Sequence, residues 1–352
     1  MTNSLRIVLM GIALLLAPVG VLHADQAAPA PLFVDPGYHG SCDPEAVWNP
    51  ADERWYLYYT ARRATRESAS YVGTPIGVAS SADLREWRFE GYCDFHDAPS
   101  VKHTGQPDMA VTFWAPGITR VGETLHMFVT YKDNAKPPWA GKGEIRHYTT
   151  TADDPVNGWT LVEPPNFQQP DPIDATLVFD KETGKHRAYY RVGKGGGIQW
   201  AESDDLLSWK NRGKVKGDVN TLGKKRYGYQ EAPYVFRFKG AWWMLTDPHK
   251  GLAVYRSDDG VTWTYHNNIL AEGSERNMDG TMARHPSVIV HNGRALMFYH
   301  CEPNRLYGKG SPGAEKRTTH QKKSVLQVAE LLIEEQKLVA KRDVKLPSMV
   351  KP

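Results

Sequence analysis

Asp43-Pro44-Glu45-Ala46-Val47, followed after a turn by Trp55-Tyr56-Leu57-Tyr58-Tyr59, is the first copy of the pattern that decides the fold. A polar residue stands ahead of a short apolar strand, and an aromatic-rich strand comes next. The same order, opened by a polar or aromatic residue, returns in segments that begin at Trp114, Asp174, Glu231 and His285. Because equivalent positions of repeats take equivalent positions in space, we expect one architecture built from five similar units.

Each unit continues with a third strand and a polar turn. Residues 76–87, 198–209 and 252–263 share an alternating strand, a Ser/Asp turn and a tryptophan that opens a fourth strand, and 145–159 is a looser copy. Asp and Ser suit such a turn because their side chains bind nearby backbone N–H groups. Units of four antiparallel strands in roughly 55 to 70 residues are typical of a β-propeller. The sequence therefore predicts an all-β, five-bladed β-propeller; the alternative is a β-sandwich whose strands resemble one another by chance.

The end of the fifth unit is less regular. We expect strands over 324–330 and 337–341, so that the last blade also has four strands. A single propeller domain then spans residues 33–345. A helix is the alternative for this tail, because several of its residues fit a helical period: Val328, Leu331, Leu332 and Glu335.

The first 24 residues have the composition of a targeting signal. Arg6 gives a positive start, residues 7–21 form an apolar stretch, and Leu22-His23-Ala24 offers a cleavage site. An uncleaved membrane anchor is the alternative, although the apolar run is short for a full span. We expect a signal peptide over 1–24, a flexible lead over 25–32, and a mature protein that is secreted or periplasmic and has no later membrane span.

Charge and cysteine content argue against several classes of function. The formal net charge is +3 over 352 residues, which is too small to indicate a nucleic-acid partner. The 3 cysteines allow at most one disulfide within the chain, and their spacing fits no zinc site. Cys42, next to Asp43, is interpreted as a packed residue rather than a nucleophile. The many aromatic residues suit a carbohydrate-facing protein, so an oligosaccharide or polysaccharide is the expected partner.

Three of the repeated segments place a carboxylate near the start of the innermost strand, which lines the central channel of a propeller. Asp43, Asp174 and Glu231 are therefore expected to face one mouth of that channel. Glycoside hydrolysis needs a carboxylic acid and a second carboxylate, held about 6.5–9.5 Å apart when the anomeric configuration inverts. Asp43 is the candidate base and Glu231 the candidate acid, with Asp174 as the charge that keeps the acid protonated; the alternative roles of Asp174 are to orient the acid or to bind a sugar hydroxyl. A turn residue is the alternative for each, and Glu45 competes with Asp43.

The same segments carry a resemblance to a known family. They resemble, in order along the whole mature chain, the motifs of glycoside hydrolase family 43 and its five-bladed relatives: Cys42-Asp43-Pro44, Trp114-Ala115-Pro116, Ile173-Asp174 and Gln230-Glu231-Ala232-Pro233. The resemblance implies an inverting glycosidase with Asp43 as base, Asp174 as pKa modulator and Glu231 as acid. It implies no required cofactor.

Two further segments bear on that resemblance. His285 lies where the family often places a histidine near the propeller axis, which implies a Ca²⁺ site there; a hydrogen-bonded histidine without metal is the alternative. Arg284 precedes it where the family commonly has glycine. Met278-Asp279-Gly280-Thr281 resembles family 117, whose members cleave anhydrogalactose linkages, although the N-terminal helical segment of that family is not visible in the sequence.

The expected substrate contacts surround the channel mouth. Trp114 offers an indole for stacking on a sugar, with blade packing as its alternative role, and Arg62, Arg284 and His285 offer polar contacts. A set of cations suggests an acidic or sulfated sugar: Arg62, Arg63, Arg146, His147 and Arg191. The candidate substrates are arabinofuranosides, xylosides and anhydrogalactosides of plant or algal polysaccharides. A non-catalytic sugar-binding propeller, or a related phosphorylase or fructosidase, is the alternative function.

Overall fold

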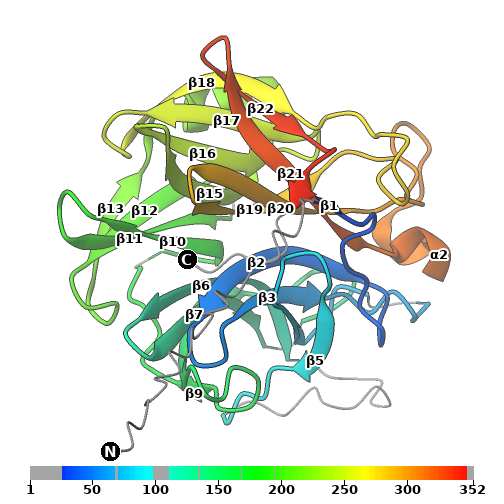
Figure 1. Cartoon of the computed structure of the whole chain (residues 1–352), viewed down its shortest axis with the longest axis horizontal. Coiled ribbons are helices and arrows are strands. Elements are labelled where there is room, and N and C mark those ends of the chain that lie inside the picture. Colours follow the sequence, from blue (N-terminus) through cyan, green and yellow to red (C-terminus); the bar gives the residue numbers. More distant parts are fainter. Residues whose placement is uncertain are drawn as a thin grey trace, which may run out of the picture.

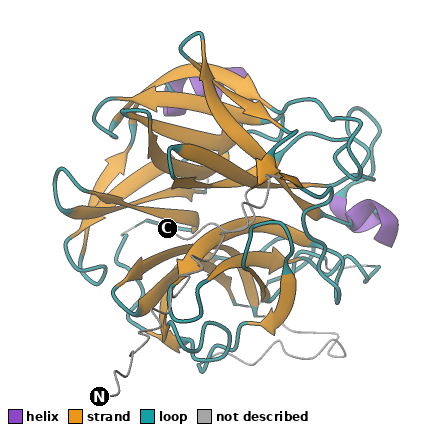
Figure 2. Cartoon of the chain, in the orientation of Figure 1, coloured by secondary structure: helices purple, strands orange, loops and turns teal. Residues whose placement is uncertain are grey.

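The computed structural model describes residues 26–67, 70–97, 111–133, 135–167, 169–193 and 195–346, and the signal-peptide prediction for 1–24 lies outside them. Five antiparallel sheets, each with four strands from the repeat, surround a central axis, and their innermost strands contact one another in a closed ring (Figure 1). The all-β, five-bladed propeller is therefore confirmed. Helices are short and lie in the connections (Figure 2). No helix among these residues is long and apolar enough to span a bilayer.

Each blade follows the chain from its innermost strand to its outer edge. Blade one contains β2 (Ser41–Asn49), β3 (Arg54–Ala61), β4 (Ile76–Ser81) and β5 (Arg88–Tyr92), and blade two contains β6 (Thr112–Val121), β7 (Thr124–Lys132), β8 (Gly143–Thr151) and β9 (Thr160–Leu161). Blade three contains β10 (Pro172–Asp180), β11 (Lys185–Val192), β12 (Gly197–Ser203) and β13 (Trp209–Lys214), and blade four contains β15 (Glu231–Phe238), β16 (Ala241–Asp247), β17 (Leu252–Ser257) and β18 (Thr262–Ile269). Blade five contains β19 (Arg284–His291), β20 (Arg294–Cys301), β21 (Val325–Glu334) and β22 (Lys337–Lys341). A short strand, β14 (Lys216–Gly217), pairs in parallel with β18. The helices are a π-helix (Val219–Gly223), α1 (Lys224–Tyr227), a 3-10 helix (Ala314–Lys316) and α2 (Thr319–Lys322).

The tryptophan at the start of the fourth strand packs a blade on its predecessor. The Trp159 ring meets Tyr58 of blade one edge-on, with ring centroids 5.8 Å apart, and Trp263 meets Tyr189 of blade three in the same way at 6.1 Å. All four of these rings are buried, which suits their apolar area. The same contact recurs at two further interfaces: Trp209 with Phe128, and Trp87 with Phe298.

The polar turn before that tryptophan has the same hydrogen bonds in three blades. In blade one the Asp83 N–H donates to Ser81 Oγ at 3.2 Å, and Asp83 Oδ1 accepts the N–H groups of Arg85 and Glu86 at 2.9 Å. The turns at 203–205 and 257–259 repeat the arrangement. Ser and Asp thus satisfy the backbone of the turn, as their place in the repeat predicts.

The ring closes by pairing the residues ahead of blade one with blade five. β1 (Gln26–Ala27) pairs with β23 (Lys345–Leu346), and the Leu32 N–H donates to the Leu326 carbonyl at 2.9 Å. Residues 26–32, expected as part of a flexible lead, are thus tied by backbone pairing to residues 326 and 344–346; Leu32 is buried, whereas Gln26, Ala27 and Pro29 are exposed. The outer half of that blade consists of β21 and β22, as the strand interpretation predicts, and is not helical.

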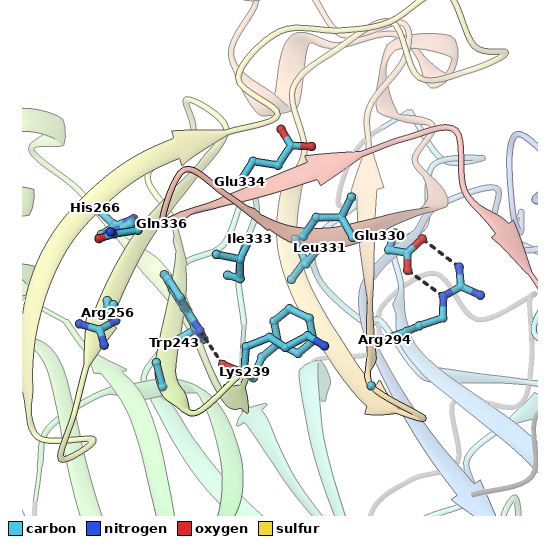
Figure 3. Close-up of a pocket in the computed structure, with 14 residues that line it drawn as sticks. Lys239, Trp243, Arg256, His266, Arg294, Glu330, Leu331, Ile333, Glu334 and Gln336 are labelled. Atoms are coloured by element: carbon cyan, nitrogen blue, oxygen red, sulfur yellow. Dashed lines mark hydrogen bonds and ion pairs between the residues drawn. The ribbon is translucent and has the colours of Figure 1, made fainter.

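A cavity of about 910 Å³ lies between blades four and five, bordered by the turns that follow β15, β19 and β21 (Figure 3). Trp243, His266 and Ile333 contribute to its wall. Its turns lie at the opposite ends of the inner strands from Asp174 and Glu231. Cavity size therefore does not identify the functional site, which has to be located from its side chains.

Candidate active site

The innermost strand of every blade has a β-bulge at the channel mouth, and one residue of each bulge has a left-handed backbone. The φ angles of these residues lie between 40° and 56°: Asp43, Ala115, Asp174, Ala232 and His285. Such angles are uncommon for residues with a Cβ atom and cost conformational energy, which frequently accompanies function. The bulges therefore define one layer of equivalent residues around the mouth, and it contains two carboxylates and an imidazole.

These bulges correct the register that the sequence suggests. The sequence pattern aligns Trp114 and Glu231 with Asp43; in the structure each precedes the left-handed residue of its blade by one position, as Arg284 does. The error arises because a bulge sets two residues opposite one, so that strand starts alone do not fix the alignment. Prolines at 44, 116, 233 and 286 follow the left-handed residue in four blades and mark the correct register. Trp114, Glu231 and Arg284 thus belong to a second layer.

A side chain of the preceding blade binds the N–H group of most left-handed residues. Four such bonds, of 2.8–3.3 Å, end on the second strand of that blade: Ala115 to Thr60, Asp174 to Thr130, His285 to Asp247, and Asp43 to His300. The equivalent residue on the second strand of blade three is Arg191, which offers no acceptor. The N–H of Ala232, the left-handed residue of blade four, donates to Asp174 Oδ2 of blade three at 3.2 Å instead. Every blade therefore positions the mouth residue of the next one.

Asp43 lies between an imidazole and a guanidinium. Its Oδ1 is 3.3 Å from His285 Nδ1 and 3.6 Å from Arg62. Its N–H donates to His300 Nδ1, which requires that nitrogen to be unprotonated. Burial, together with the charges of Arg62 and Arg284, holds the pKa of His300 well below its usual range, in agreement with a neutral ring. The neighbouring Cys42 thiol is buried and contacts the Thr60 carbonyl, as a packed residue would.

Asp174 favours its protonated form. Burial raises the pKa of this carboxyl to about 7; His285 opposes the shift, and the negative charges of Glu231 and Asp43 add to it. Near neutral pH a large fraction of the Asp174 carboxyl groups is therefore protonated, and the charges of Glu231 and Asp43 favour this form.

Glu231 is stabilised as a carboxylate by three neighbours. Its Oε1 lies 2.7 Å from His249 Nε2 and 3.6 Å from the Arg284 guanidinium. Its Oε2 accepts the Tyr229 hydroxyl at 2.5 Å. Burial would raise the pKa of Glu231, but His249, Arg284 and Tyr229 together lower it below its usual range. Because the pKa of Asp174 is raised and that of Glu231 is lowered, Asp174 is the more readily protonated of the two in the ligand-free protein.

A buried carboxylate that the sequence does not single out joins the two sides of the site. Glu302 lies 3.4 Å from Arg62 and 3.3 Å from Arg284. Burial would raise the pKa of Glu302, yet the surrounding guanidinium groups hold it at about 2. Because Arg62 contacts Asp43 and Arg284 contacts Glu231, Glu302 fixes the cations beside both. A contact of either arginine with substrate stays a prediction.

Trp114 lies at the mouth and is fixed by the protein. Its Nε1–H donates to the Tyr71 carbonyl at 2.8 Å, and Lys132 Nζ lies 4.6 Å from its ring centroid. This cation occupies one face of the indole. Stacking of Trp114 on a sugar stays a prediction.

Glu45, the competitor of Asp43, lies deeper in the channel. Its Oε1 accepts the Tyr234 hydroxyl at 3.0 Å, and burial raises its pKa well above its usual value. Glu45 is thus buried and neutral, so its environment favours a hydrogen bond inside the channel over the role of a base.

The cations expected at the mouth separate into two groups. Arg63 is buried, Arg146 is held in two ion pairs, and His147 stacks on Phe128 with ring centroids 4.2 Å apart. Arg191 instead follows the pattern of a mouth residue, since its guanidinium lies 4.4 Å from the ring centroid of Tyr229. The predicted cluster therefore does not form as a whole.

The metal prediction rests on His285. Ca²⁺ takes about six to eight oxygen ligands, and Asp43 is the carboxylate in contact with the His285 ring among the described residues. An ion there would take most of its ligands from water, so the Ca²⁺ site stays a prediction. A second group of side chains with ligand atoms close together consists of Glu231, Asp247 and His249. The Arg284 guanidinium lies 2.7 Å from Asp247 and already supplies a positive charge to this group.

The segment that resembles family 117 contains a structural aspartate. Asp279 is fully buried and accepts the Tyr299 hydroxyl at 3.0 Å and the Cys301 thiol at 3.1 Å. Arg342 approaches the same carboxylate at 3.1 Å. These contacts tie the loop before blade five to β20, so packing accounts for the aspartate without a role in chemistry.

Sequence reasoning missed the two residues that bind Glu231 most closely. His249 lies in the loop between β16 and β17, and Tyr229 lies just before β15. Loops after the second strand of a blade reach the mouth, as Arg62 does after β3. Applied to every blade, this rule would have identified His249 from the sequence.

Comparison with known protein families finds a matching family model. The model of glycosyl hydrolases family 43 matches residues 68–322, which include Asp174 and Glu231. No curated protein sequence matches the chain.

Solved structures with the same fold include hydrolases of that family. A family 43 β-xylosidase/α-arabinofuranosidase from a compost microbial metagenome, in complex with xylotriose in a calcium-free form, has 16% identity and a TM-score of 0.63 over 89% of this chain and 97% of its own. A family 43 enzyme from Xanthomonas citri, complexed with xylotriose, has 15% identity and a TM-score of 0.62 over 90% and 93%. A β-fructofuranosidase of family 32 from Bombyx mori has 14% identity and a TM-score of 0.59 over 88% and 66%. At identities as low as these, the structural likeness shows a shared fold and nothing further.

Proposed function

Because the chain belongs to glycosyl hydrolases family 43 and is a glycoside hydrolase, we propose that it cleaves its substrate with inversion of the anomeric configuration. Asp43 is the general base in this proposal, Glu231 the general acid and Asp174 the modulator of the acid. The observation that carries it is the layer of left-handed residues that brings Asp43 and Asp174 to one mouth, with Glu231 one residue away from that layer. Blade five separates the base from the acid, which suits the gap of about 6.5–9.5 Å that leaves room for water.

The proposed step moves two protons. A water molecule attacks the anomeric carbon and gives a proton to Asp43 while the glycosidic bond breaks. The leaving oxygen takes the proton of Glu231. Arg62 and His285 contact the Asp43 carboxylate and fix its position, as a general base requires.

Glu231 has to carry a proton when the bond breaks, although the ligand-free site favours its carboxylate. A sugar oxygen that displaces His249 from Oε1 would remove one contact that lowers the pKa, and burial would then raise it. Asp174, whose pKa is about 7, keeps a proton within the pair near neutral pH. Substrate binding is therefore proposed to move that proton to Glu231.

Xylosides and arabinofuranosides are the proposed substrates. Support comes from the printed activities and ligands of structural relatives, which include a β-xylosidase/α-arabinofuranosidase and complexes with xylose and xylotriose. An anhydrogalactoside loses its specific support in the sequence, because Asp279 is accounted for by packing. We also propose that the enzyme acts after export, on the composition of residues 1–24.

The test compares wild type with Asp43→Asn and Glu231→Gln on aryl xylosides, aryl arabinofuranosides and xylotriose. Each substitution is expected to lower kcat by about 10²- to 10⁴-fold, the usual contribution of a general acid or base. Asp204→Asn, an exposed aspartate paired with Lys185 away from the mouth, is the matched control. Proton NMR of the first product formed is expected to show the inverted anomer.

Other outcomes select other functions. Undiminished turnover in either variant contradicts the assignment of that residue, and a retained anomer contradicts inversion. Binding of these sugars without cleavage by wild type indicates a sugar-binding propeller. Cleavage that requires phosphate indicates a phosphorylase, and cleavage of sucrose indicates a fructosidase.

A further inference from the structure

One tryptophan differs from the others in its exposure. The chain has 11 tryptophans, all within the described residues, and the other ten are buried or half-buried. The Trp139 side chain is 53% exposed. A single exposed apolar residue is not unusual by itself, so the surroundings of Trp139 decide whether its exposure has a function.

The backbone of Trp139 is held in place. The residue lies in the β7–β8 loop, which reaches the channel mouth, and its carbonyl accepts a hydrogen bond from Lys132 Nζ at 3.2 Å. Lys132 also donates to the Gly141 carbonyl at 3.0 Å, and Lys136 pairs with Ala140 through two backbone hydrogen bonds. The exposed indole is therefore presented from a segment, 136–141, that these hydrogen bonds hold in place.

A chain of contacts connects Trp139 with the proposed base. The Tyr71 ring meets the indole edge-on, with centroids 5.8 Å apart. The Arg62 guanidinium lies 4.9 Å from the Tyr71 ring centroid and 3.6 Å from Asp43. Tyr71 is itself fixed, since its hydroxyl accepts a hydrogen bond from Arg317 at 2.8 Å. Trp139 is thus two side chains away from Asp43 and extends the mouth outward on the side of blades one and two.

An indole exposed beside a sugar site has a natural ligand. One face of a pentose or hexose ring consists of C–H groups, and an aromatic ring shields that face from water while the hydroxyl groups stay hydrated. From these contacts we propose that Trp139 is a distal subsite that stacks on an additional sugar unit of an oligosaccharide, beyond the unit that is cleaved at the carboxylates. This inference rests on the proposed function and assigns it a substrate class, namely oligosaccharides longer than a single glycoside.

The test compares substrates with and without a sugar at that distance. Trp139→Ala is expected to lower kcat/KM on xylotriose by about threefold to tenfold, mainly through KM, the loss that removal of an aromatic contact gives. Hydrolysis of β-xylosyl fluoride, whose leaving group is one atom, is expected to be unchanged. If wild type prefers arabinosides, arabinotriose and α-arabinofuranosyl fluoride take their places. Unchanged fluoride hydrolysis also shows that the variant is folded.

Two further variants provide controls. Trp139→Phe keeps an aromatic face and is expected to retain most activity on the trisaccharide. Phe179→Ala removes an exposed aromatic ring near the end of β10, on the opposite face, and is expected to leave hydrolysis of both substrates unchanged. An equal loss on both substrates, or no loss on the trisaccharide, would overturn the subsite.

If the protein does not hydrolyse these sugars, the subsite is tested by binding instead of by turnover. If wild type cleaves none of these substrates, binding of xylotriose and arabinotriose is measured by calorimetry. Weaker binding by Trp139→Ala, with Phe179→Ala unchanged, supports the subsite in a sugar-binding protein. Equal binding, or no binding to wild type, overturns it.

Discussion

Glu231 Oε1 and His249 Nε2 lie 2.7 Å apart, so the proposed acid is bound by an imidazole before any substrate arrives. The contact lowers the pKa of Glu231 against the effect of burial. In the ligand-free site Asp174 is therefore protonated in preference to Glu231. His249 opposes the protonation of Glu231 that catalysis requires.

Replacement of His249 by glutamine is expected to move the alkaline limb of the pH profile of kcat/KM upward. Glutamine keeps a hydrogen-bond donor but cannot carry a positive charge, so the pKa of Glu231 is expected to rise and the pair to keep its proton to higher pH. The shift should be about 0.5 to 1 pH unit, because His249 is 42% exposed and solvent screens its charge. The measurement is kcat/KM from pH 4 to about 9 on an aryl glycoside, over the range where such groups titrate.

His320→Gln provides the control for that experiment, since His320 is exposed on α2 and away from Glu231. A limb that stays in place or moves to lower pH in His249→Gln would show that the imidazole does not control the acid.

Asp174→Asn is expected to move the same limb in the opposite direction. In wild type Asp174 holds the proton of the pair up to a pKa of about 7, so activity should be present below that pH and be lost above it. The asparagine variant keeps only Glu231, whose pKa is lowered by His249, Arg284 and Tyr229, and its activity should decline at lower pH. The loss in kcat near neutral pH should be about 10²-fold or more, as for loss of an acid. An alkaline limb that remains near pH 7 would assign that ionisation to another group.

Asp279→Asn is expected to reduce stability and leave chemistry intact. The substitution breaks a buried ion pair with Arg342 and disturbs the bonds from Tyr299 and Cys301. The expected loss in free energy of unfolding is about 3–5 kcal/mol, measured by denaturant titration, with an unchanged kcat for the folded fraction. Asp258→Asn, at an exposed pair with Arg256, should change stability by less than about 1 kcal/mol. A large fall in kcat without loss of stability would instead assign Asp279 to the chemistry.

The architecture could be predicted because local chemistry repeats. The Ser/Asp turn and the tryptophan after it recur in sequence and make the same contacts in space, and the aromatic second strands are buried as their composition requires. The register of the mouth could not be predicted from strand starts, because each bulge inserts a residue. Glu231 was assigned to the correct blade and to the wrong layer.

The charge network of the site lies beyond what periodicity can reveal. Glu302 and His249 follow the second strands of their blades, where the repeat ends and the loops differ in length. One partner of Glu302 comes from another blade, since Arg62 of blade one contacts it, whereas His249 binds Glu231 within blade four. Pairs of this kind depend on how loops meet around the axis, which no single repeat encodes.

The hydrogen bond from the Asp43 N–H to His300 crosses the seam where the last blade meets the first. The proposed base is therefore positioned by residues near the end of the chain, through the same junction that β1 and β23 help to close. A nascent chain that lacks blade five would have its acid and its modulator but no oriented base. Hydrolytic activity should then begin only when the circle is complete, which makes turnover itself a reporter of the final assembly event.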